Sequence, residues 1–98
     1  MTDDTQMKLD ILRAAVKLAK SRGFRSFSRD DVAQAAKTAT GTVSYHYRGM
    51  TGLRRAVMQY AIDNEVLEIV AQGLAERHVM AVKAPEELRL RAAGCLAK

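Results

Sequence analysis

The sequence of 98 residues contains no tryptophan, one proline, one cysteine and two phenylalanines. The single cysteine, Cys95, excludes an internal disulfide framework and is typical of a reducing compartment, so we expect a cytoplasmic protein. No apolar run approaches the roughly 20 residues that a membrane-spanning helix needs, so we expect no membrane partner. The acidic start, MTDDTQMKLD, also lacks the basic and then apolar order of a signal peptide.

Residues that carry enzyme chemistry are equally scarce. With two histidines and one cysteine, a metal site is not expected. No phosphate-binding glycine loop, HExxH pattern or paired-cysteine motif occurs, and the placement of serine, histidine and aspartate suggests no triad. We therefore predict a protein that is not an enzyme, with no cofactor and no metal.

What the sequence does contain favours helices. Alanine, leucine, lysine, arginine, glutamate and methionine dominate, and the only proline is Pro85. The length allows one small domain. We predict an all-α fold with a three-helix head, a long fourth helix and a fifth helix used for dimerisation, divided into a head at 1–49 and a helical dimerisation region at 50–98.

The first two helices are predicted from local signals. The apolar stripe of Leu9, Leu12, Val16 and Ala19 indicates a helix over 7–22, and Ile11, Ala15 and Leu18 broaden this stripe. We expect Gly23 to be its left-handed cap and Phe24 and Phe27 to pack inwards. Ser28 and Asp31 are spaced as in a capping box that opens the second helix, whose inner face we assign to Val32, Ala35 and Ala36.

The remaining helices follow from spacing and turn signals. A tight turn near 37–39 precedes a short third helix over 40–47. The stripe that runs from Leu53 to Leu74 predicts one long fourth helix. After a poorly patterned join over 76–84, Pro85 opens the last helix.

Charge is concentrated in the first half of the chain. Residues 8–55 contain eleven Lys/Arg and three Asp, whereas residues 56–98 contain five Lys/Arg and six Asp/Glu. A cationic half suggests a polyanionic partner, with a well-solvated basic surface as the alternative.

The stretch TATGTVSYHYRG, residues 38–49, fits such a partner. Two short helices joined by a tight turn indicate a helix-turn-helix, whose second helix enters the DNA major groove near its N-terminal end. Small residues let the backbone approach, aromatic side chains reach the groove wall, and arginine neutralises phosphate. We therefore expect double-stranded DNA as partner, contacted by Arg29, Lys37, Thr38, Thr40, Gly41, Thr42, Ser44, Tyr45, His46, Arg48 and Arg54.

The segment 9–60 resembles the DNA-binding region of TetR-type transcriptional regulators. The features that carry the resemblance are "IL..A..L....G", "S..DVA..A" and "GTV...Y". The resemblance implies base contacts by Thr40 and His46 and phosphate contacts by Thr42 and Tyr45. It also implies core roles for Val43 and Tyr47.

The sequence departs from the family pattern at several positions. Lys37 stands where the turn usually has glycine, and Ala39 replaces the usual capping serine. Ser44 stands where the family often has tyrosine. Met50 replaces a lysine that meets phosphate, a loss for which Arg48, Arg54 or Arg55 can compensate.

The family resemblance also implies a longer C-terminal part with an inducer pocket, but only 49 residues follow Gly49. Two helices cannot both dimerise the protein and enclose a cavity of ~300 Å³. We therefore expect a homodimer through the last two helices and no small-molecule ligand. In size the chain resembles short plasmid-borne repressors.

These observations predict a homodimeric, sequence-specific repressor on an inverted-repeat operator. Two alternatives stay open. One is a helical protein-interaction module whose head is only structural, and the other is a repressor with a ligand site between protomers.

Overall fold

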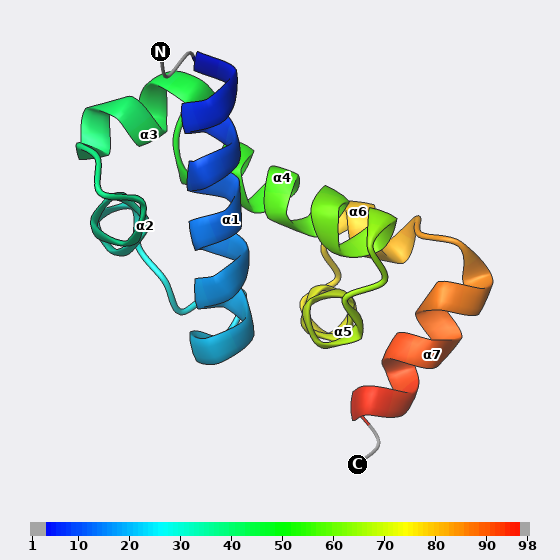
Figure 1. Cartoon of the computed structure of the whole chain (residues 1–98). Helices are drawn as coiled ribbons and strands as arrows, with labels where there is room; N and C mark the ends of the chain where they lie inside the picture. Colours follow the sequence, from blue (N-terminus) through cyan, green and yellow to red (C-terminus); the bar gives the residue numbers. More distant parts are fainter. Residues whose placement is uncertain (1–3, 97–98) are drawn as a thin grey trace. The chain divides into compact units, whose positions relative to one another are not determined.

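A computed structural model describes residues 4–96, and within this range the chain forms helices and turns but no strand (Figure 1). The predicted all-α fold class is confirmed. The helices are α1 (Asp4–Arg22), α2 (Arg29–Ala36), α3 (Thr40–Tyr47), α4 (Met50–Asp63), α5 (Leu67–Ala75), α6 (Val79–Val82) and α7 (Glu86–Leu96).

The chain divides into two units, the first ending at Val57 and the second beginning at Met58, so that α4 belongs partly to each. Each unit is described by itself. The division into a head at 1–49 and a dimerisation region at 50–98 stays a prediction. Residues 1–3 of the predicted head and residues 97–98 of the predicted dimerisation region lie outside the described range. No helix in the described range has the length and apolarity that crossing a bilayer requires.

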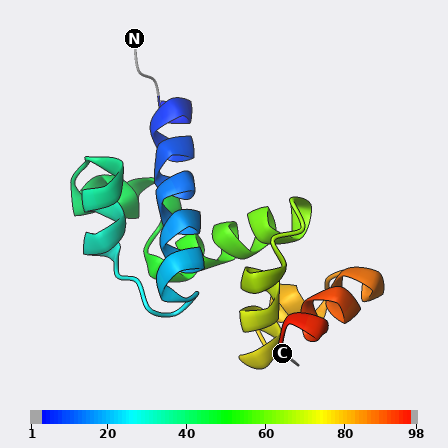
Figure 2. The same ribbon diagram turned by 60° about the horizontal axis from the view of Figure 1, so that its bottom comes forward.

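Unit 1 is a bundle in which α1 contacts both α2 and α3, and α2 contacts α3 (Figures 1 and 2). The predicted inward packing of both phenylalanines is confirmed, because Phe24 and Phe27 are buried in the α1–α2 connection. The largest fully buried side chains of this unit are Ile11, Phe24, Val32, Val43, Leu53 and Val57. The unit therefore has an apolar core to which every one of its helices contributes.

The buried side of α1 is the Ile11 side of the broad predicted stripe. Ile11 and Ala15 are fully buried beside Val16 and Ala19, whereas Leu9 is 39% exposed. Both sets of residues recur at helical spacing, so periodicity alone does not choose between them. The small side chains of Ala15 and Ala19 let the neighbouring helices pack closely, which favours the Ile11 side. Gly23 ends α1 as predicted, with φ at 104°.

The predicted capping box of α2 is confirmed. The Ser28 hydroxyl accepts from the Asp31 N–H at 3.2 Å, and the Ser28 N–H donates to the Asp31 carboxylate at 2.9 Å. The predicted inner face is partly wrong, since Ala33 is buried and Ala35 is exposed. At about 100° per residue, Ala33 lies about 100° to one side of Val32 and Ala35 about 60° to the other, so spacing alone does not decide between them, and the buried side of α2 is the one with Ala33.

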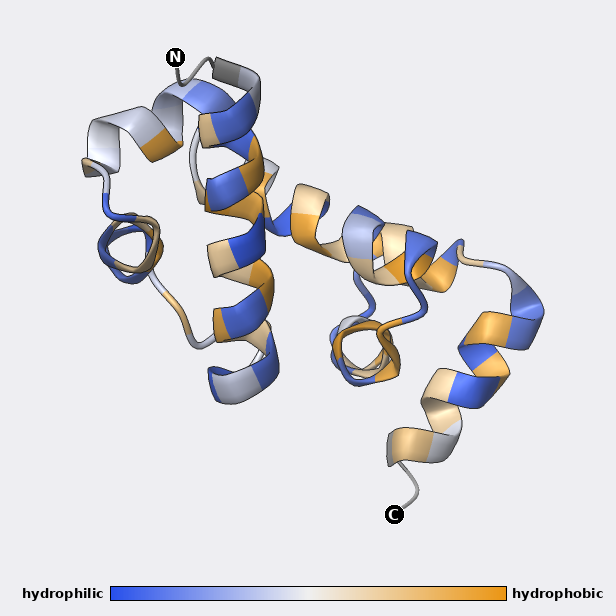
Figure 3. Cartoon of the chain, in the orientation of Figure 1, coloured by the Kyte–Doolittle hydropathy of each residue, from blue (hydrophilic) through white to orange (hydrophobic). Residues whose placement is uncertain are grey.

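Unit 2 is built around α5, which contacts α6 and α7. Figure 3 shows α5 as predominantly hydrophobic, and Ile69, Val70 and Ala71 of this helix are buried. A Cβ at Gly73 would lie 2.4 Å from the Met58 side chain and 2.8 Å from the Ala81 Cβ. The missing side chain of Gly73 is thus what lets these parts of unit 2 pack together.

The predicted long fourth helix is wrong, because the chain leaves the helix after Asp63 and resumes at Leu67. Glu65 adopts a left-handed conformation, with φ at 54°. Its N–H donates to the Ile62 carbonyl, and the Val66 N–H donates to the Ala61 carbonyl at 2.8 Å, which is the hydrogen-bond pattern of a Schellman cap. The same pattern at Arg77 ends α5, and the predicted join contains the short α6.

Candidate nucleic-acid interface

The third helix spans the predicted residues, Thr40–Tyr47. Its N-cap is Ala39, which supplies no side-chain hydrogen bond. Its C-cap is Arg48 in a left-handed conformation, with the backbone N–H donating to the Ser44 carbonyl at 2.7 Å. A helix of eight residues is marginal by itself, so contacts with the rest of unit 1 must hold it in place.

Two side chains of α3 provide those contacts, and their predicted core roles agree with their burial. Val43 is fully buried and Tyr47 is 9% exposed. The Tyr47 hydroxyl donates to the Lys8 carbonyl of α1 at 2.8 Å. Burial raises the pKa of the Tyr47 hydroxyl above its ordinary value, which keeps this donor protonated. The bond fixes the C-terminal end of α3 against the N-terminal part of α1.

The outward side of α3 is slim near its start and aromatic near its end. Gly41 is exposed, and a Cβ placed there would meet no atom within 4 Å. Tyr45 is 73% exposed, and its ring meets the His46 ring edge-on with 5.1 Å between centroids. In Figure 3 most of α3 is pale, so this side is neither strongly hydrophilic nor an apolar patch. Such a surface can approach the polar floor of a DNA groove closely.

Two predicted DNA-binding residues contact one another. Arg29, the first residue of α2, donates from its guanidinium to the Ser44 hydroxyl of α3 at 2.7 Å. The bond joins residues 15 positions apart in the chain. It holds the arginine beside the middle of α3, so any ligand of Ser44 meets a positive charge at the same place.

The C-terminal end of α3 lies beside the N-terminal part of α1 (Figure 1). A hollow lies at this place. Three predicted residues, Tyr45, His46 and Arg48, line it together with Thr5 and Lys8 of α1. Sequence reasoning missed Thr5 and Lys8, because only the Tyr47 bond and the packing of α1 bring them to α3. In the sequence, Lys8 is distinguished in no way from the ten other cations of residues 8–55.

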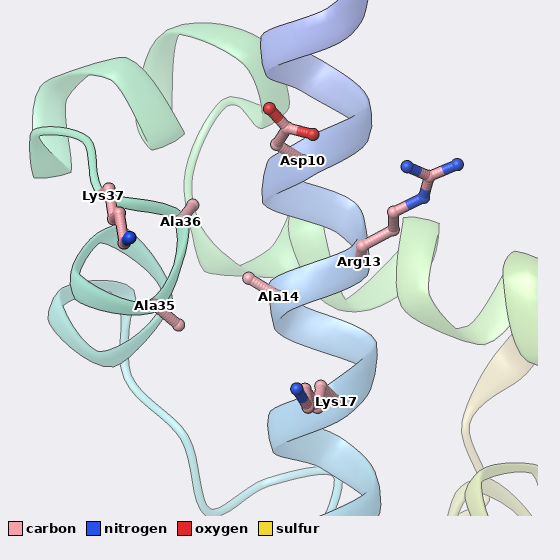
Figure 4. Close-up of a pocket in the computed structure, with 7 residues that line it drawn as sticks. All are labelled: Asp10, Arg13, Ala14, Lys17, Ala35, Ala36 and Lys37. Atoms are coloured by element: carbon pink, nitrogen blue, oxygen red, sulfur yellow. The ribbon is translucent and has the colours of Figure 1, made fainter.

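Lys37 does not line the hollow between α1 and α3. It has φ at 58° and caps α2, in the left-handed conformation for which the family usually has glycine. Figure 4 shows it at the end of α2, beside a groove between α1 and α2 in which Ala14, Ala35 and Ala36 lie between the two helices. The residues that line this groove are Asp10, Arg13, Ala14, Lys17, Ala35, Ala36 and Lys37.

Arg54 is held against the core of unit 1. Its guanidinium carbon lies 5.9 Å from the centre of the Phe27 ring, and its Nε is buried without a hydrogen-bond partner among the described residues. It is not among the residues that line the hollow at α3. Thr38, Thr40 and Thr42 are half-buried along the turn and the first turn of α3.

The charge around α3 is predominantly positive. Lys8, Arg29 and Arg48 come close to it, whereas the carboxylate of Asp31 on α2 is engaged by its own cap and by Arg22 at 3.3 Å. Hydrogen bonding by Ser28, assisted by Arg22, holds the pKa of Asp31 below its usual value. Within residues 4–96, no three His, Cys, Asp or Glu side chains gather into a group that could bind a metal ion.

Comparison with known proteins gives a family match over part of the chain. The family described as bacterial regulatory proteins, tetR family, matches residues 11–57, which confirms the resemblance seen in the sequence. The match ends at the residue where unit 1 ends. No curated protein and no solved structure matches the chain.

Proposed function

We propose that this chain is a repressor that binds an inverted-repeat operator as a homodimer. The premise is the match of residues 11–57 to the tetR family of bacterial regulatory proteins, which supports a DNA-binding transcriptional regulator. The observation that carries the proposal is the outward side of α3. It combines an unobstructed glycine, an exposed tyrosine and flanking arginines on a helix that Val43 and Tyr47 anchor in the core.

In this proposal α3 enters the major groove with its N-terminal end leading. Thr40 and His46 contact base edges, and Thr42 and Tyr45 contact phosphate. Arg29 acts together with Ser44, because the two side chains are hydrogen-bonded. Further phosphate contacts or positive potential come from Lys37, Thr38, Arg48 and Arg54. These contacts make the affinity for DNA fall steeply as the salt concentration rises.

The dimer is the second part of the proposal. We place its interface on unit 2, whose described residues include the exposed apolar side chains Val79, Val82 and Leu90, the last of them 66% exposed. Apolar side chains that remain exposed in one copy are suited to burial against a second copy. Two copies would place their recognition helices in successive major grooves, about 34–36 Å apart.

The third part is that this chain works without a small-molecule inducer in unit 2. Support comes from the filled space around Gly73, where the Met58 and Ala81 side chains leave no room even for a methyl group. A hollow lined by Gln59, Ile62, Met80 and Lys83, with Ala84 and Pro85, is open to solvent. It lacks the enclosure that buries most of a drug-sized ligand.

Selection of bound duplexes from a random DNA pool tests the proposal, because it reports binding, preferred sequence and symmetry together. We expect enrichment of an inverted repeat, and we expect the double variant Tyr45→Ala/His46→Ala to lose operator binding while sedimenting as the same dimer. If no duplex is enriched, or the double variant binds as the parent does, the proposal fails and the protein-interaction module gains support.

A thermal-shift screen of the parent protein tests the inducer part separately. Small cationic and aromatic compounds should leave the melting temperature unchanged. A compound that raises it consistently, and releases the operator, would replace this part of the proposal with a ligand site between protomers.

A further inference from the structure

The hollow between α1 and α3 is lined by groups suited to a phosphate. Lys8 and Arg48 supply permanent positive charge, Thr5 and Tyr45 supply hydroxyl donors, and His46 supplies an imidazole. No carboxylate is among the lining residues whose side chains the structure describes. The hollow also lies at the N-terminal turn of α1, where the helix dipole favours an anion.

The two cations come from different segments, and both are attached to the same anchor. The Lys8 ammonium lies 5.5 Å from the centre of the Tyr47 ring, while the Lys8 carbonyl accepts the Tyr47 hydroxyl. Arg48 directly follows Tyr47, and its backbone is fixed by the bond to Ser44. Since Tyr47 is buried, the backbone positions of both cations are set before any ligand arrives.

The two ion pairs given for the described residues, Arg22 to Asp31 and Arg91 to Glu65, involve neither Lys8 nor Arg48. The hollow adjoins the outward side of α3, because Tyr45 belongs to both surfaces. An anion in the hollow would therefore lie at the border of the surface that faces DNA.

We propose that this hollow binds a backbone phosphate of duplex DNA at the edge of the groove that α3 enters, and that Lys8 of α1 is a phosphate-contacting residue of the interface. The inference rests on the proposed function. It extends the interface beyond the helix-turn-helix to the N-terminal part of α1. A phosphate diester accepts hydrogen bonds from the hydroxyls and from both cations, and it carries no sequence information.

The test measures the salt dependence of operator binding by the full chain, using a duplex from the random-pool selection. Loss of one phosphate contact should lower the slope of log K against log salt by about 0.9, which corresponds to about eightfold weaker binding at 0.1 M salt relative to a 1 M reference. We expect this change for Lys8→Gln and for Arg48→Gln, with the preference for operator over scrambled duplex unchanged. Lys8→Arg should keep the parent slope.

Lys20→Gln is the matched control. Lys20 is an exposed cation on the same helix, but it does not line the hollow. We expect it to keep the parent slope. Equal slopes for Lys8→Gln and Lys20→Gln, whether both reduced or both unchanged, would overturn the inference, because the hollow would then have no special role.

A second arm separates the DNA backbone from a free anion. The His46 ring resonances of the DNA-free protein should not show saturable shifts with millimolar inorganic phosphate. Saturation that disappears in Lys8→Gln would reassign the hollow to a small anion and overturn the inference as stated. If the parent protein enriches no duplex at all, the proposed function fails first; if it does but Lys8→Gln keeps the parent slope, only this inference fails.

Discussion

Replacing Gly41 by alanine should stabilise the protein and weaken its binding to DNA. Gly41 lies in the first turn of α3, is exposed, and has open space where a Cβ would stand. Alanine exceeds glycine in helix preference by about 1 kcal/mol in a helix interior, and we expect about 0.5–1 kcal/mol in the first turn. For a domain of this size, the melting temperature should rise by about 2–8 °C.

The same methyl group is placed on the side of α3 that we propose faces the groove. A close contact that must accommodate an extra carbon costs about 1–3 kcal/mol when neither surface can move. We therefore expect the operator dissociation constant to rise about 5- to 150-fold. Thermal melting followed by circular dichroism and fluorescence anisotropy with a labelled duplex measure the two effects on one preparation.

Gly94→Ala is the control. Gly94 is exposed in α7, and a Cβ added there would likewise meet no atom within 4 Å. This variant should gain comparable stability and bind the operator like the parent. If Gly41→Ala is stabilised and still binds DNA at full strength, the outward side of α3 is not the surface that approaches DNA, and the reasoning about the interface is refuted.

Three further predictions concern packing, capping and pH. Gly73→Ala should lower the free energy of unfolding by about 1–3 kcal/mol, because its methyl group would overlap the Met58 and Ala81 side chains. Denaturant unfolding of this variant and of Gly94→Ala measures the effect, since Gly94→Ala should raise the free energy of unfolding. Ala39→Ser should raise the free energy of unfolding by about 1 kcal/mol, because it supplies the missing N-cap of α3; an unchanged melting temperature would contradict the cap assignment. Asp31 has a folded-state pKa lowered mainly by the Ser28 hydrogen bonds, so its contribution to stability is present above the ordinary value of 3.8 and is lost as pH falls through the lower folded value. Asp31→Asn should therefore be less stable than the parent at neutral pH, and the difference should shrink in acid melts below about pH 3.8; a difference independent of pH would show that the carboxylate charge plays no part.

The elements that could be predicted from the sequence are those with strictly local signals. Ser28 and Asp31 form a capping box three residues apart, and Gly23 ends a helix because glycine adopts positive φ without strain. The third helix has the predicted bounds because the turn before it and the Arg48–Gly49 pair after it enclose it on both sides. Each of these features is decided within one or two turns of chain.

What could not be predicted depends on residues distant in sequence or on turns without their usual residue. Glu65 and Arg77 end α4 and α5 in left-handed conformations, and neither residue type signals such an end. The apolar stripe continues across Glu65, which is why the pattern predicts one long helix. At the interface, the Arg29–Ser44 bond and the approach of Lys8 to α3 join segments 15 and 39 residues apart, and no local pattern specifies them.

Between residues 4 and 96, four helix ends are closed by a non-glycine residue in the left-handed region, namely Lys37, Arg48, Glu65 and Arg77. A left-handed conformation costs an L-residue about 1–2 kcal/mol, and glycine removes that cost while adding about 0.5–1 kcal/mol of chain entropy to be lost on folding. Substitution by glycine at any of these positions should therefore give a modest gain in the free energy of unfolding. An average substitution elsewhere costs about 1 kcal/mol. A lineage carrying this fold can therefore alter α3 towards a new operator and regain stability at a helix end away from the proposed DNA-facing surface, such as Arg77.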